Sequence, residues 1–94
     1  MERAGALLRL RGRLVRASVA EVWPQALAAL DGVHALDLHA LDALDSAGLA
    51  LLAELLERLP PRDTPRIEGQ PPGLAGLRAA YRMNADLARA QGTP

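Results

Sequence analysis

Segments with the apolar pattern of a β-strand alternate along this chain with segments that have the apolar pattern of an α-helix. This order restricts the possible folds more than any other feature of the sequence. Leu8, Leu10 and Leu14 alternate with arginines, whereas the leucines of residues 49–59 recur at helical spacing. Strands that alternate with helices indicate a mostly parallel sheet, after an opening hairpin, with helices packed against it. Strands are expected at residues 6–10, 13–15, 33–38 and 66–68. Helices are expected at residues 18–30 and 46–59, a third helix after Gly73, and a short helical turn at residues 84–90. We therefore predict a small α/β fold of about four strands and three to four helices, in one domain over residues 1–94.

The two opening strands, on either side of Gly12, place leucines on one side and arginines on the other. We expect Arg9, Arg11 and Arg13 to be solvated charges of an edge strand, which discourage sheet-to-sheet aggregation. A nucleic-acid surface is the alternative. The formal net charge of zero gives no long-range attraction to nucleic acid or anionic lipid.

The first helix is expected to begin at Ser18. Glu21 follows three residues later, which is the spacing of a capping box. Pro24 lies inside the helical pattern and should kink or restart the helix, because its ring removes one backbone hydrogen bond. The pair Asp31-Gly32 closes the helix, and residues 62–64 form a later turn.

Composition limits the chemistry available to the chain. Half of the 94 residues are hydrophobic, but Trp23 and Tyr81 are the only aromatic residues, so an aliphatic core is expected. The absence of cysteine excludes disulfides, thiol nucleophiles and cysteine-bound metals, and the absence of lysine excludes a lysine-containing phosphate loop. Residues 1–16 lack the apolar segment of an export signal, and no apolar run approaches the roughly 20 residues that span a bilayer. We expect a cytoplasmic protein without direct membrane insertion.

Side chains suited to metal or acid–base chemistry are scattered. His34 and His39 lie five residues apart across a predicted strand and so on opposite faces, which is poor metal geometry; both are interpreted as ordinary strand-end residues. Strand, loop and helix-cap positions explain Asp37, Asp42 and Asp45 better than a carboxylate cluster does. We expect no enzyme activity, no metal and no cofactor.

The last helix is expected to carry Leu74, Leu77 and Tyr81 on one face. Arg78 and Arg82, four residues apart, lie on one side of it. We interpret them as solvated surface charges, and pairing with an acidic partner is the alternative.

The central helix, capped by Asp45 or Ser46 and running to about Leu59, has two different faces. Its six leucines fall within an arc of roughly 160°, wider than the stripe that a surface helix usually buries: Leu49, Leu51, Leu52, Leu55, Leu56 and Leu59. The extra width either covers a second contact or belongs to the margin of the buried face. Small and acidic residues occupy the opposite side: Ser46, Ala50, Ala53, Glu54 and Glu57. Gly48 in the first turn is a further small residue of this helix. Small side chains let another protein's backbone come close, so this helix is predicted to dock onto a partner.

Ser46 has three candidate roles. As an N-cap it would contribute about 1 kcal/mol to the helix. As a phosphate acceptor at a helix N-terminus, it would place the added negative charge favourably in the helix dipole. As a contact residue it would hydrogen-bond a partner. Spacing alone favours the cap.

The run Asp45-Ser46-Ala47-Gly48-Leu49-Ala50-Leu51-Leu52, which begins eight residues after Asp37, resembles the signature of STAS domains (sulfate transporter and anti-sigma factor antagonist). The resemblance continues through Ile67-Glu68-Gly69 and from Pro72 to Met83. It covers nearly the whole chain, most weakly the first twenty residues, and implies a STAS-like fold.

The resemblance implies two competing functions. In the one we favour, the chain is a non-catalytic subunit of the Mla phospholipid ABC transporter, which maintains outer-membrane lipid asymmetry. Its partner would be an MlaF-like ATPase in complex with a membrane permease, and the chain would lie at the inner membrane through that partner. The ATPase would contact the exposed side of the central helix: Asp45, Ser46, Ala47, Gly48, Ala50, Ala53, Glu54 and Glu57.

In the other function, the chain is an anti-sigma factor antagonist whose Ser46 is phosphorylated by a partner kinase. Ala47, Ala50 and Ala80-Tyr81 resemble the transporter branch, whereas a serine at position 46 is commoner in the sigma-regulating branch. A weaker third alternative is a stand-alone nucleotide- or lipid-binding module.

Overall fold

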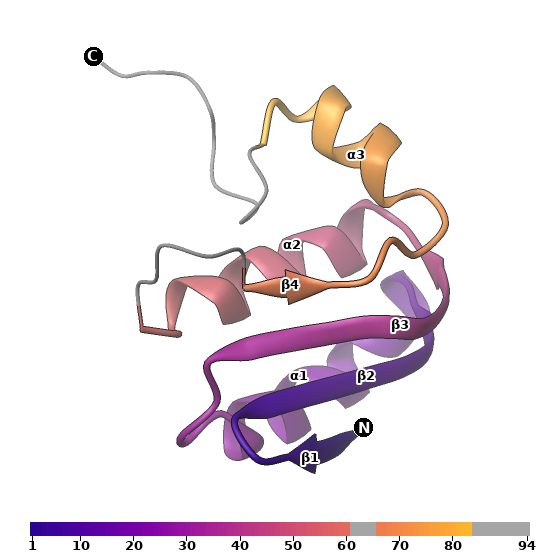
Figure 1. Cartoon of the computed structure of the whole chain (residues 1–94). Helices are drawn as coiled ribbons and strands as arrows, with labels where there is room; N and C mark the ends of the chain where they lie inside the picture. The colour runs from indigo at the N-terminus through magenta and orange to yellow at the C-terminus, as the bar shows by residue number, and fades with distance from the viewer. Residues whose placement is uncertain (61–65, 84–94) are drawn as a thin grey trace.

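The strands form one sheet, with the two longer helices on one of its faces, in the computed structural model, which describes residues 1–60 and 66–83. The elements are β1 (Glu2–Ala4), β2 (Leu7–Leu14), α1 (Arg16–Ala29), β3 (Ala35–Leu44), α2 (Ser46–Glu57), β4 (Ile67–Glu68) and α3 (Leu74–Ala80). The sheet has the order β1-β2-β3-β4; β1 is antiparallel to β2, and the other neighbours are parallel. In Figure 1, α1 and α2 lie behind the sheet and α3 lies near the start of α2. The predicted small α/β, STAS-like fold with an opening hairpin is confirmed.

The hairpin turns at Gly5 and not at Gly12. Gly5 has a φ of +62°, in the left-handed region that glycine tolerates best, and it lies in the two-residue turn between β1 and β2. Gly12, with a φ of +80°, lies where the pairing of β2 with β3 shifts register, so β2 bulges there and continues. The prediction of two short strands around Gly12 is therefore wrong. Both glycines supply a positive φ, and the sequence does not distinguish a turn from a bulge.

β2 is an interior strand. Its leucines Leu8, Leu10 and Leu14 are buried, as their alternation predicts. However, β1 pairs along one side of β2 and β3 along the other, so the arginines of β2 are not edge-strand charges as expected. They lie on the sheet face opposite the leucines, where two of them form ion pairs.

The first helix begins two residues before the predicted cap. Val15 is the N-cap of α1, and Ser18 acts from the third helical position, where its hydroxyl accepts a hydrogen bond from the Val15 N–H at 3.1 Å. Glu21 lies beyond the first turn, so the predicted capping box of Ser18 and Glu21 is wrong. Pro24 lies inside α1, which continues to Ala29 without restarting.

The later elements differ from the predicted ranges at their ends. β3 continues to Leu44, so Asp42 is an exposed strand residue and not part of a loop. α3 ends at Ala80, which leaves Tyr81 as its C-cap with 43% of its surface exposed. Arg82 lies beyond the helix with a φ of +54°, so it does not share a helical side with Arg78. The predicted turn at 62–64 and the helical turn at 84–90 lie outside the described residues.

Arginines close the C-terminal ends of both long helices, where four carbonyl groups lack helical partners. Arg3 Nη1 donates to the carbonyl oxygens of Ala29 and Asp31 at 3.0 and 2.8 Å, at the end of α1. Arg66 Nη1 lies 3.0, 3.1 and 3.1 Å from three carbonyl oxygens at the end of α2: those of Leu56, Leu59 and Pro60. These contacts tie β1 and the start of β4 to the helix ends. No described helix is long and apolar enough to cross a membrane.

Candidate partner-docking site

The start of α2 is held by Asp45 at the end of β3. One carboxylate oxygen of Asp45 accepts a hydrogen bond from the Gly48 N–H at 2.9 Å, and the other accepts one from the Arg16 N–H at 2.9 Å. The Arg16 and Gly48 N–H groups hold the pKa of the Asp45 carboxyl below its usual range. A single carboxylate thus fixes the N-termini of α1 and α2 beside each other.

Ser46 is the first helical residue and not the cap. Asp45 has the extended backbone of an N-cap, and its side chain accepts a hydrogen bond from the Gly48 N–H. This N–H group lies in the first turn and has no acceptor within the helix, so the aspartate takes the role expected of a capping serine. The capping role favoured for Ser46 is therefore wrong. Its side chain is exposed, and among the described residues its hydroxyl has no hydrogen-bond partner. The hydroxyl is thus available to solvent, a partner or a modifying enzyme.

Gly48 belongs to the interior and not to the exposed small-residue face on which it was predicted. A Cβ at this position would collide with the backbone carbonyl of Leu14 and lie 2.9 Å from Leu44 Cδ1. The glycine therefore lets α2 approach the ends of β2 and β3 closely.

The leucine face of α2 is used entirely inside the fold. All six leucines of residues 49–59 are at most 5% exposed. They pack with leucines of β2 and β3 and with α1 in one core. The wide leucine arc thus serves the core, and the alternative that part of it covers a second contact is wrong.

The exposed side of α2 carries the other predicted residues. Ser46, Ala50, Glu54 and Glu57 are exposed; Ala47 and Ala53 are half-buried, as is Asp45. The structure brings most of the predicted partner-binding residues to one surface, and it removes Gly48 from it.

An open hollow of about 580 Å³ adjoins the first turns of α2. Its lining combines three segments of the chain: Arg16, then Asp45, Ser46, Ala47, Leu49 and Ala50, and finally Tyr81 and Met83. Tyr81 is the one large hydrophobic residue exposed in the described part of the chain, whereas Leu74, predicted on the same face of the last helix, is buried. The sequence prediction missed Arg16 and Met83, because only the fold brings them to the start of α2.

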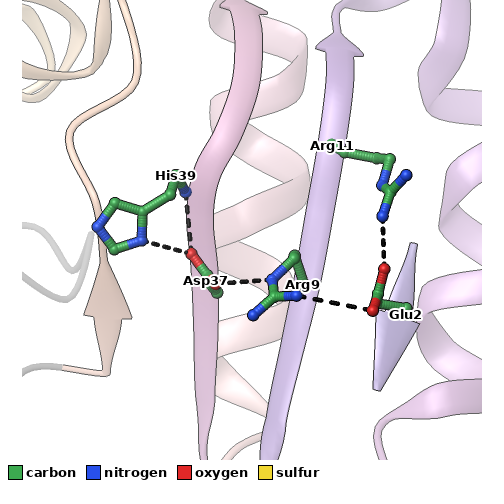
Figure 2. Close-up of polar contacts among 5 residues, drawn as sticks. All are labelled: Glu2, Arg9, Arg11, Asp37 and His39. Carbon is green, nitrogen blue, oxygen red and sulfur yellow. Dashed lines mark hydrogen bonds and ion pairs between the residues drawn. The ribbon is translucent and has the colours of Figure 1, made fainter. Parts of the chain in front are cut away.

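A separate network of charges lies on the sheet face opposite the helices (Figure 2). Asp37 is only 5% exposed; Arg9 Nε donates to its Oδ2 at 2.9 Å, and His39 Nδ1 lies 2.7 Å from its Oδ1. Glu2 continues the network through ion pairs to Arg9 and Arg11. The backbone N–H of His39, and then Arg9, lower the pKa of Asp37 to about 2.

This network is missing from the sequence predictions. His39 lies inside β3 and binds Asp37, so its interpretation as a plain strand-end residue is wrong. The network forms because the parallel pairing of β2 and β3 places Arg9 opposite Asp37, and no spacing along the sequence indicates that pairing. Asp37, Asp42 and Asp45 do not converge, and over residues 1–60 and 66–83 no three His, Cys, Asp or Glu side chains form a metal site.

The chain is similar to a known protein family over almost all of its length. The family model described as "Mlab, STAS domain" matches residues 1–89, which includes both α2 and the hollow. No curated protein matches the chain.

Proposed function

The chain belongs to the MlaB-like STAS domain family, and from this membership we propose that it is the STAS subunit of a phospholipid-transporting ABC system. It binds the ATPase subunit through the exposed side of α2 and supports ATP hydrolysis. The transporter maintains outer-membrane lipid asymmetry. The chain itself is cytoplasmic and lies at the inner membrane through the ATPase and its permease.

The observation that carries this proposal is the surface formed by the start of α2 and the hollow beside it. Exposed Ser46 and Ala50 allow close approach of a partner backbone, and the exposed ring of Tyr81 offers apolar area next to them. Aromatic residues at the centre of a contact commonly carry much of its binding energy. Because the leucines of α2 are buried in the core, the side of the helix that is exposed among the described residues is the one that carries Ser46 and Ala50.

The proposal assigns no catalytic step to this chain. Neither histidine nor lysine lines the hollow, so Ser46 has no neighbouring base of that kind there. The Asp45 carboxylate is occupied by hydrogen bonds from the Arg16 and Gly48 N–H groups, which position the two helices. The chain therefore acts by binding.

Co-purification tests the proposal. Tagged chain expressed with the ATPase and permease of the same organism should retain the ATPase, and Ala50→Arg should lose it. Ala28→Arg, which introduces the same side chain at an exposed position of α1, is the matched control and should retain the ATPase. Retention by Ala50→Arg, with both variants folded by circular dichroism, would refute docking through α2.

A second candidate function rests on the exposed Ser46 hydroxyl. As the first residue of α2 it lies where the helix dipole favours a phosphate, which fits an anti-sigma factor antagonist controlled by phosphorylation. Incubation with the cognate kinase and ATP should then add one phosphate at Ser46, detected by mass spectrometry and absent in Ser46→Ala. An unmodified Ser46, together with retention of the ATPase, decides for the transporter.

A further inference from the structure

The surface along α2 carries opposite charges at its two ends. Arg16 lies at the hollow beside the N-terminus of α2, and Glu57 is the last residue of the helix. Ala50 and Glu57 lie seven residues apart, which is nearly two turns on one side and about 10 Å along the axis. We call Arg16, Ala50, Tyr81 and Glu57 the docking strip: Arg16 makes one end basic, Ala50 and Tyr81 line the same hollow as Arg16, and Glu57 makes the other end acidic.

The charge at the basic end is not cancelled within the described chain. The guanidinium of Arg16 forms no ion pair with the described residues. The nearby carboxylate of Asp45 accepts hydrogen bonds from two helix N-termini, whose partial positive charge offsets it. This end of the docking strip therefore favours an acidic group.

At the acidic end, Glu57 provides the unpaired charge. Arg58 donates to Glu54 Oε1 at 3.0 Å, and its guanidinium carbon lies 5.2 Å from the centre of the Trp23 ring. Glu54 and Arg58 thus neutralise each other, whereas Glu57 is exposed and forms no ion pair within residues 1–60 and 66–83.

We propose that this polarity fixes the direction in which the partner segment lies along α2. The segment places an acidic side chain against Arg16, an apolar side chain in the hollow beside Ala50 and Tyr81, and a basic side chain opposite Glu57. The inference rests on the proposed function, because it describes the segment of the ATPase that docks there. Charges at the rim of an interface mainly set orientation and association rate, while the apolar centre supplies affinity.

Charge reversals in the full chain test the direction. Binding of the purified ATPase subunit is measured by isothermal titration at low and high salt for Arg16→Glu and Glu57→Arg. Each reversal should weaken binding about fivefold at low salt, and each variant should lose less affinity than the wild type when the salt is raised. Arg13→Glu and Glu68→Arg are the matched controls on β2 and β4 and should bind within about twofold of the wild type.

The outcomes separate this inference from the function on which it rests. If Ala50→Arg abolishes binding while Arg16→Glu and Glu57→Arg bind like the wild type, docking stands and the proposed direction is wrong. If Ala50→Arg also binds like the wild type, the docking function fails. If the Arg13 and Glu68 controls weaken binding as much as the strip reversals do, general charge and not the strip directs the contact.

Discussion

The carboxylate of Asp45 lies 2.9 Å from the backbone nitrogen of Arg16, which precedes it by 29 residues. Its other oxygen caps α2 through the Gly48 N–H. One side chain thus serves the first turns of two helices, and these turns frame the hollow at the docking site. The shape of the site depends on this bridge as much as on the residues that line it.

Loss of the Asp45 bridge should destabilise the fold and loosen the site. Asp45→Ala leaves two helix N–H groups without acceptors, and we expect the Tm to fall by about 5 °C or more. Asp45→Asn should lose less, because its amide oxygen still accepts one hydrogen bond. Thermal unfolding followed by circular dichroism measures both, with Asp42→Ala on the exposed side of β3 as the control. Equal Tm values for Asp45→Ala and Asp42→Ala would contradict the bridging role.

Asp37 should make stability depend on pH. Its pKa of about 2 in the folded protein lies below the unfolded value, so ionised Asp37 stabilises the fold above about pH 5. That contribution is lost as the pH falls from about 5 to about 2. Asp37→Asn should lower the free energy of unfolding by about 1 to 2 kcal/mol at pH 7; the loss is no larger because solvent at the part-exposed Arg9 screens the ion pair. The variant should also lose less stability than the wild type as the pH falls from about 5 to about 2.

Urea unfolding between pH 7 and pH 3 measures the contribution of Asp37. His39→Ala should be milder than Asp37→Asn, because the largest influence on the Asp37 pKa is the His39 backbone N–H, which alanine retains. Wild type and Asp37→Asn that lose stability in parallel on acidification would contradict the assignment.

Gly48 and Gly76 should respond oppositely to alanine. A Cβ at Gly48 meets the Leu14 carbonyl, so Gly48→Ala forces backbone to shift and should cost at least about 2 kcal/mol. A Cβ at Gly76, inside α3, has no described neighbour within 4 Å, so Gly76→Ala should stabilise by about 0.5 to 1 kcal/mol through helix propensity. Chemical denaturation of both variants is the measurement. A Gly48→Ala protein as stable as the wild type would refute the close approach.

Arg66 should be needed to close α2. Arg66→Met keeps most of the apolar stem but leaves three carbonyl oxygens at the helix end without this donor, at a cost of about 1 to 2 kcal/mol. Arg13→Met, at an exposed position, should change stability by less than about 0.5 kcal/mol. The two free energies of unfolding, compared in urea, decide whether the arginine acts at the helix end or only as surface charge.

The sequence predicted those features that depend on neighbours along the chain. The leucine spacing of residues 49–59 gave the buried face of α2, and the alternation of Leu8, Leu10 and Leu14 gave the buried face of β2. Ser46, Ala50, Glu54 and Glu57 were correctly placed on the exposed side of the same helix.

Features that depend on register between distant segments were missed. The contacts of Arg9 with Asp37 and of Arg16 with Asp45 join residues 28 and 29 positions apart, and they exist only because β3 lies parallel to β2. The burial of Gly48 has the same origin, since the end of β2 determines what the glycine meets. No local spacing contains this information.

If the exposed side of α2 docks the chain onto an ATPase and supports its activity, the chain should raise the rate of ATP hydrolysis. This rate is measured on the purified ATPase–permease complex, with and without added chain. We expect wild type and Ala28→Arg to raise the rate, and Ala50→Arg to leave it at the level measured without the chain. A rate raised equally by Ala50→Arg would show that the chain does not act through the exposed side of α2, and a rate left unchanged by the wild-type chain would show that it does not support the ATPase.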